Sequence, residues 1–81
     1  MDIKVLGPGC KNCETLAVNT EKALAELKKE ANIEKVTDFK VIAKYGVLST
    51  PGLVINGKVL STGKVLKPKQ IMKLIEKVSY E

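Results

Sequence analysis

Two cysteines, Cys10 and Cys13, lie three residues apart at the junction between a short apolar segment and a long amphipathic one. The apolar segment, residues 2–6, alternates well enough to predict a strand, and a Gly-Pro-Gly turn follows it. A helix that begins at this turn would place Cys10 at its N-terminus. Unpaired N–H groups and the helix dipole stabilise an anion there, and a thiolate is the anion that thiol–disulfide exchange requires. The same pair of thiols could instead bind a metal.

A long helix is predicted after the cysteines, because small and apolar side chains recur every three or four residues and form one buried stripe. The stripe consists of Leu16, Thr20, Ala23, Leu24, Leu27 and Ala31. Asn32 is the predicted end of this helix. Residues 33–36 are then predicted to form a second strand.

A short second helix is predicted over residues 39–45, with Asp38 as its N-cap and Gly46 as its terminator. Its inward-facing side chains are expected to be Phe39 and Ile42. Because the chain has only one Phe and no Trp, aliphatic side chains must supply most of the core.

A β-hairpin is predicted next. Asn56-Gly57 lies between two β-prone runs, and Asn-Gly is the strongest short-range hairpin signal. Gly63 interrupts the end of the second run, which indicates a bulge or a close approach of another backbone. Pro68 suits the first turn of a final helix. The apolar face of that helix carries Ile71, Leu74, Ile75 and Val78.

Size and composition limit the class of protein. The 81 residues predict one α/β domain, residues 1–81, with the element order β-α-β-α-β-β-α. No apolar run approaches the roughly 20 residues that span a bilayer, and residues 1–4 do not resemble a secretory signal. We therefore expect a cytoplasmic protein without membrane contact. In a reducing compartment, two cysteines this close are more often catalytic or metal-binding than structural.

The net charge of +5 raises the possibility of nucleic-acid binding. The lysines, however, are spread along the chain and interleaved with glutamates, and no aromatic platform accompanies them. A solvated surface is the better interpretation, so no nucleic-acid partner is expected. Nothing in the sequence demands a dimer, and we expect a monomer.

As a redox pair, the two cysteines would differ in exposure. Cys10 is expected to be accessible, whereas Cys13 lies one turn inside the helix, on the side that packs against the sheet, which suits a nucleophile and a resolving thiol. Lys11 adds a cation that should lower the pKa of Cys10, and Asn12 can help to cap the helix. Two alternatives stay open: two small buried hydrophobes, or a metal-binding module of the small copper-chaperone type. Against the metal module, Pro8 stands where Met is usual, and the chain is predicted to end in a helix.

A second motif, Ser49-Thr50-Pro51-Gly52, lies immediately before the hairpin. A proline here also has an ordinary explanation, because it suits the start of a strand. Together with the Gly-Pro-Gly-Cys-Lys-Asn-Cys opening, the run Tyr-Gly-Val-Leu-Ser-Thr-Pro-Gly resembles the small thioredoxin-like redox-active disulfide proteins of archaea and bacteria. The resemblance covers essentially the whole chain.

This resemblance implies a thioredoxin fold with a central four-stranded mixed sheet flanked by helices. It implies that Cys10 is the attacking nucleophile and Cys13 the resolving thiol. Pro51 would be cis and would lie against the Cys10 sulfur, and the backbone of Thr50 would pair with a substrate chain. Gly63 would lie near the same surface and leave room for a partner.

The implied function is a dithiol–disulfide oxidoreductase, or electron carrier, that reduces or exchanges protein disulfides. A thioredoxin-reductase-like protein or another thiol reductant would return the protein to its reduced form, and no cofactor or metal would be needed besides the Cys10–Cys13 disulfide.

The sequence departs from larger thioredoxins at Gly9 and at the Lys-Asn pair, where those proteins have Trp-Cys-Gly-Pro-Cys. The redox potential of the larger thioredoxins therefore does not transfer to this chain. Their buried acidic proton shuttle has no clear counterpart. Glu14 is a candidate by proximity, although a solvated residue at the helix N-terminus is the preferred interpretation. A disulfide that acts only as a regulatory switch stays possible.

Overall fold

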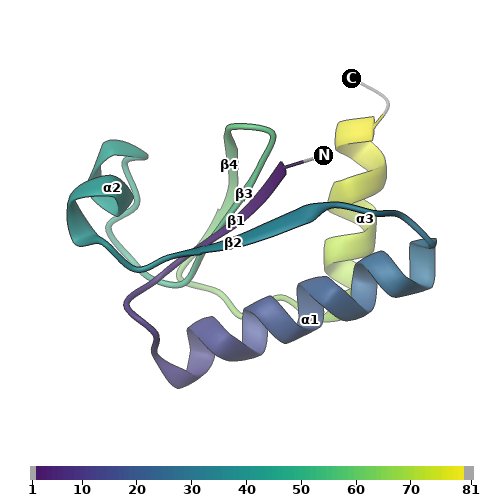
Figure 1. The fold of residues 1–81 in the computed structure, drawn as a ribbon, viewed down its shortest axis with the longest axis horizontal. Helices are drawn as coiled ribbons and strands as arrows, with labels where there is room; N and C mark the ends of the chain where they lie inside the picture. Colours follow the sequence, from purple (N-terminus) through teal and green to yellow (C-terminus); the bar gives the residue numbers. More distant parts are fainter. Residues whose placement is uncertain (1, 80–81) are drawn as a thin grey trace.

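A four-stranded mixed sheet forms the centre of the molecule, as the computed structural model of residues 2–79 shows (Figure 1). The elements are β1 (Asp2–Leu6), α1 (Lys11–Leu27), β2 (Asn32–Val36), α2 (Phe39–Lys44), β3 (Gly52–Ile55), β4 (Lys58–Thr62) and α3 (Pro68–Ser79). The predicted α/β class and element order are therefore confirmed. In the described range, no helix is long and apolar enough to cross a bilayer.

The strands lie in the order β2-β1-β3-β4. β1 and β2 are parallel, and α1 is the crossover that a parallel connection requires. β3 runs antiparallel to both β1 and β4. The predicted hairpin joins β3 to β4 at Asn56 and Gly57, whose φ angles of 51° and 81° suit a type I′ turn.

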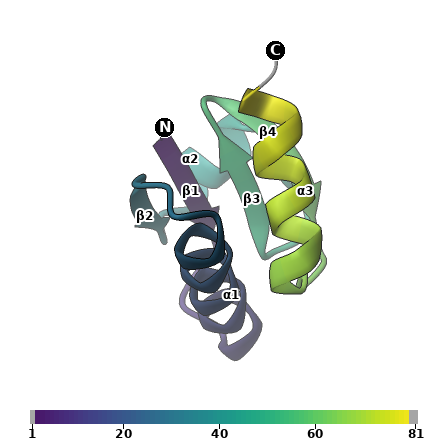
Figure 2. The same cartoon turned by 90° about the vertical axis from the view of Figure 1, so that its right-hand side faces the viewer.

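Two apolar clusters cover the two faces of the sheet, because alternate strand residues point to opposite sides. The larger cluster consists of Ile3, Val5, Leu16, Ala17, Ala23, Leu24, Leu53, Ile55, Ile71 and Ile75. The smaller cluster consists of Leu6, Ile42, Val47 and Val54. Helices α1 and α3 thus pack on one face, where they cross at a steep angle (Figure 2), and α2 packs on the other.

Helix α1 is shorter than predicted. It ends at Leu27, because Lys28 takes a left-handed conformation with φ of 53° and its N–H turns back to donate to the Ala25 carbonyl. The N–H of Lys29 donates to the Leu24 carbonyl at 3.1 Å, which completes the C-terminal turn. Ala31 therefore lies outside the helix, although it still packs against the larger cluster.

The prediction that Phe39 faces inward is wrong, since 66% of its surface is exposed. Helix α2 has six residues, fewer than two turns, so few of its positions can face the sheet. Ile42 takes that place and is buried. The predicted N-cap is confirmed: the Asp38 carboxylate accepts a hydrogen bond from the Lys40 N–H at 2.9 Å.

Candidate active site

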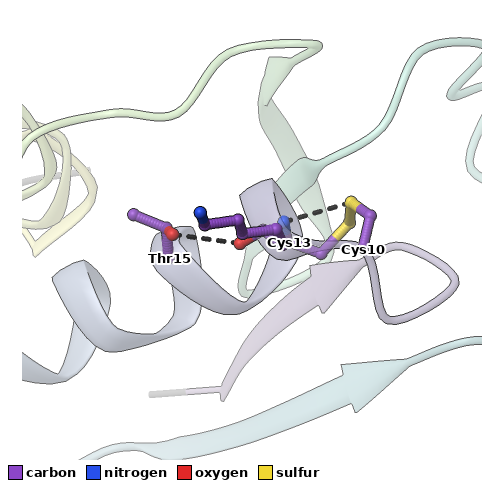
Figure 3. Close-up of a disulfide and its surroundings, with 4 residues drawn as sticks. Cys10, Cys13 and Thr15 are labelled. Carbon is purple, nitrogen blue, oxygen red and sulfur yellow. Dashed lines mark hydrogen bonds between the residues drawn. A yellow bond between two sulfur atoms is a disulfide. The ribbon is translucent and has the colours of Figure 1, made fainter.

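Cys10 and Cys13 are joined by a disulfide at the start of α1, with their Cα atoms 5.0 Å apart (Figure 3). Cys10 is the N-cap residue of the helix. Its Sγ accepts a hydrogen bond from the Cys13 backbone N–H at 3.2 Å, and its carbonyl accepts one from the Glu14 N–H at 3.0 Å. The sulfur thus takes the place that a Ser or Asp oxygen usually has at a helix start. A backbone donor and the positive end of the helix dipole both face it.

The two sulfur-bearing residues differ in exposure. Cys13 is buried, with 4% of its surface accessible, whereas Cys10 is partly exposed. One residue of the pair is therefore open to a partner molecule and the other is enclosed by protein. This difference is the one that a nucleophile and a resolving thiol require.

Lys11 and Asn12 lie exposed in the first turn of α1. The Lys11 carbonyl accepts a hydrogen bond from the Thr15 hydroxyl at 3.0 Å. The Lys11 ammonium group adds a positive charge to the residue that follows Cys10 in the chain. The capping atom is Cys10 Sγ, not an atom of Asn12. Any effect of these two residues on the pKa of Cys10 stays a prediction.

Gly7 is a residue beside the candidate site that sequence reasoning missed. It is buried at the end of β1, and its N–H donates to the Val36 carbonyl at 2.8 Å. A Cβ at this position would overlap Cys13 Sγ and would lie 3.0 Å from Cys13 Cβ and 3.8 Å from Thr50 Cβ. The absence of a side chain at Gly7 therefore allows the end of β1 to lie against Cys13. The sequence indicated only a turn at this point.

The loop before β3 reaches the same region. The Thr50–Pro51 peptide bond is cis, Pro51 is buried, and the Thr50 side chain lies near Gly7. The Gly63 N–H donates to the Pro51 carbonyl at 2.9 Å, and a Cβ at Gly63 would lie 3.0 Å from Ser49 Cβ. Gly63 thus allows the close backbone approach that its position predicted. The predicted contact between Pro51 and the Cys10 sulfur stays a prediction.

A small cavity of about 40 Å³ lies beside Cys13. It is lined by Val5, Gly7, Gly9, Cys13, Glu14, Lys35 and Thr37. Lys35 of β2 and the buried Cys13 of α1 therefore line the same cavity. The sequence had not linked β2 to the site.

The described residues include no group of three or more His, Cys, Asp or Glu side chains that could hold a metal ion. The copper-chaperone alternative also expected a chain that ends in a strand, whereas the last described element is helix α3. The fold therefore does not favour that alternative.

A parallel β-α-β unit, a hairpin and a final helix, with a Cys-x-x-Cys disulfide at the start of the first helix, define a thioredoxin-like redox protein. A protein-family model described as a thioredoxin domain matches residues 1–76, and the chain belongs to this family. No curated protein matches the chain. The family match and the disulfide together confirm the resemblance found in the sequence, and they support a thioredoxin-like redox role.

Proposed function

We propose that the protein is a dithiol–disulfide oxidoreductase that reduces or exchanges disulfides of partner proteins. The observation that carries the proposal is the position of Cys10. Its sulfur is the N-cap acceptor of α1, it is partly exposed, and it is bonded to the buried Cys13. A helix N-terminus favours the thiolate, which is the reactive form.

The reaction has two exchange steps. In the reduced protein the Cys10 thiolate attacks a partner disulfide, so a Cys10–partner disulfide forms and one partner sulfur leaves as a thiol after taking a proton. The Cys13 thiolate then attacks Cys10 Sγ, which forms the Cys10–Cys13 disulfide and releases the second partner sulfur. The partner gains two electrons and two protons. A thioredoxin-reductase-like protein or another thiol reductant would return the Cys10–Cys13 pair to its reduced form.

Binding of the partner chain is assigned to the segment around Thr50 and Pro51. Thr50 is partly exposed and lies next to Gly7, which itself touches Cys13. A strand-like pairing of a substrate with the Thr50 backbone would therefore place its disulfide near the two cysteines. The exposed Gly63, hydrogen-bonded to the Pro51 carbonyl, would leave room at the edge of this surface.

The test uses a disulfide-bonded substrate protein with excess dithiothreitol as reductant. Cys10→Ser is expected to abolish catalysed reduction. In a separate incubation without dithiothreitol, Cys13→Ser is expected to trap a covalent protein–substrate adduct, which later addition of the reductant releases. Thr15→Ser, a conservative change at an exposed position of α1, is the matched control and should retain full activity. Undiminished reduction by the Cys10→Ser variant would contradict the proposal.

A redox titration of the wild-type protein, scored by alkylation of free thiols, gives the direction of electron flow. Thioredoxin-fold dithiols span roughly −270 to −120 mV, from reductants to strong oxidants. A reversible two-electron transition in this range, together with turnover, supports an oxidoreductase. A reversible transition without turnover on any protein disulfide would identify a regulatory switch instead.

A further inference from the structure

The net charge of the protein is concentrated in β4, α3 and the loop between them. Residues 58–79 contain one acidic side chain, Glu76, and six lysines, which gives a net charge of +5. Residues 1–57 contain eight lysines and seven acidic side chains, a net charge of +1, and Glu81 brings the total back to +5. Lysines are therefore interleaved with acidic residues in the first 57 residues but not in the segment that follows.

Five of these lysines are exposed, and within residues 2–79 none of the five forms an ion pair. They are Lys64, Lys67, Lys69, Lys73 and Lys77. The last three follow one another at four-residue steps along α3, a spacing at which like charges repel and destabilise a helix. Carboxylates of a partner molecule would relieve this repulsion.

A groove of about 730 Å³ lies beside these lysines, where the start of α3 meets α1 (Figure 2). Lys67 and Lys69 line one side of it, and Glu26 lines it from α1. Pro68 and Met72, both partly buried, add apolar surface. A methionine side chain is flexible and adapts to apolar partners of different shape. The groove therefore combines an apolar contact with two exposed cations.

This groove is separated from the disulfide along α1. Glu26 follows Cys13 by 13 residues in the same helix, which corresponds to about 20 Å along the helix axis. A molecule that contacts the groove and the disulfide together must span about this distance, by the same helix geometry. A small disulfide compound is too short for that, whereas a protein is not.

Exposed apolar side chains lie between the two regions. The Asn19 side-chain amide donates to the Leu66 carbonyl at 2.9 Å, which fixes the loop before α3 to α1. The residues that precede these two, Val18 and Val65, are 47% and 36% exposed. Val18 lies between the disulfide and the groove along α1. A protein that reaches from one to the other would therefore bury part of this apolar surface.

The chemistry of the groove fits a protein better than a nucleic acid. Residues 58–79 contain no aromatic side chain on which a base could stack. Glu26 would repel the uniform negative charge of a phosphate backbone, whereas a protein segment can present carboxylates to the lysines and an uncharged side chain to Glu26. A second copy of the chain is disfavoured, because both copies carry a net charge of +5.

We propose that this groove, with Lys67 and Lys69, docks an acidic segment of a redox partner protein, and that the segment carries an apolar side chain between its carboxylates. The inference rests on the function proposed above, because it takes the docked protein to be one whose sulfur reaches Cys10. Docking at a distance from the disulfide steers the partner by charge and raises its local concentration at Cys10.

Binding is tested first, with the oxidised protein and a labelled cysteine-free peptide, Glu-Leu-Glu-Glu-Leu-Glu, by fluorescence anisotropy at low salt. Each exposed ion pair multiplies an affinity by about 1.4 to 5, so the double variant Lys67→Gln/Lys69→Gln should bind about 2- to 25-fold more weakly. A salt concentration of about 0.5 M should remove this difference, because salt screens exposed charges. The peptide with Gln in place of each Glu should bind the wild type and the double variant equally weakly.

The matched control is Lys40→Gln/Lys44→Gln. It removes the same charge from exposed positions of α2, on the other face of the sheet, and should leave the affinity within about twofold of wild type, the low end for two exposed pairs. A general effect of net charge would weaken both double variants alike. Replacing the two leucines of the peptide by serine should also weaken binding, because the apolar contact is lost.

The second test links docking to the disulfide. The Glu-containing segment is attached to a small disulfide-bonded loop peptide through a Gly/Ser linker of about 12 residues, whose average span is about 19 Å. At low salt the wild type should reduce this peptide with a higher kcat/KM than the loop peptide alone. Lys67→Gln/Lys69→Gln should lose that advantage and should reduce the loop peptide alone at the wild-type rate, which also shows that the variant is folded.

Equal binding of the Glu and Gln peptides by the wild type, or equal losses in the two double variants, would overturn the inference. Tighter binding of a single-stranded oligonucleotide of the same net charge, lost in Lys67→Gln/Lys69→Gln, would also overturn it and assign the groove to nucleic acid. A wild type that binds the Glu peptide but does not reduce the loop peptide would instead contradict the oxidoreductase proposal.

Discussion

Gly7→Ala is the change that most directly tests the packing beneath the disulfide. The added methyl group would overlap Cys13 Sγ and lie 3.0 Å from Cys13 Cβ. Cys13 cannot swing aside, since it is held by α1 at its backbone and by Cys10 at its sulfur. Overpacking of a well-packed site costs about 1–3 kcal/mol. The loss of a glycine from the unfolded chain returns about 0.4–1 kcal/mol.

These ranges differ by about 0–2.6 kcal/mol, and the middle of that span, about 1.3 kcal/mol, is the expected loss in the free energy of unfolding, a substantial share of what a chain of this length possesses. Urea unfolding measures it: with a slope near 1–1.5 kcal/mol per molar, the midpoint should fall by about 1 M. The same substitution in a Cys13→Ala background should cost less, because the sulfur is gone. An unchanged midpoint for Gly7→Ala in the wild-type background would refute the steric argument.

Three further substitutions test other parts of the fold. Ile71→Ala empties a fully buried position of the larger cluster and should cost about 2–5 kcal/mol in urea unfolding, whereas the exposed Lys73→Ala should change little. Asp38→Ala removes the cap of α2 and should cost about 1 kcal/mol by the same assay. The hydrogen bond and charge of Tyr45 raise the pKa of Lys4 above its ordinary 10.5. This interaction stabilises the fold below pH 10.5 and is lost as the pH rises through the higher folded-state pKa. The difference in unfolding midpoint between wild type and Tyr45→Phe should therefore shrink above that pH.

The order of elements was predictable because its signals are local. Asn56 and Gly57 readily adopt the positive φ angles of a tight hairpin turn, whatever the rest of the chain does. Pro68 lacks an N–H group, which a residue in the first turn of a helix does not need. The position of the thiols followed equally from the turn that precedes α1. The end of α1 was not predictable from the sequence. Lys28 takes the left-handed conformation that ends the helix, whereas Gly or Asn usually occupies such a position.

Features that depend on distant parts of the chain were not predictable. The exposure of Phe39 is decided by how a six-residue helix lies on the sheet, not by the spacing of its apolar residues. The fit of Gly7 against Cys13 and Thr50 joins three segments. Likewise, Lys35 reaches the cavity only because β2 pairs with β1 in one register. Each of these is set by tertiary packing.

The two faces of the sheet are covered unequally on either side of the candidate active site. Among the described residues, the cluster beneath α1 and α3 has ten buried members and the cluster beneath α2 has four. Regions with few buried apolar contacts open locally at lower free energy. The cysteines lie at the start of α1, which packs on the larger cluster. Residues 45–49, which lead to Thr50, follow α2 on the face that carries the smaller cluster. Under the proposed function, α1 would hold the two cysteines in fixed geometry, while the segment before Thr50 would adjust to partner proteins of different shape.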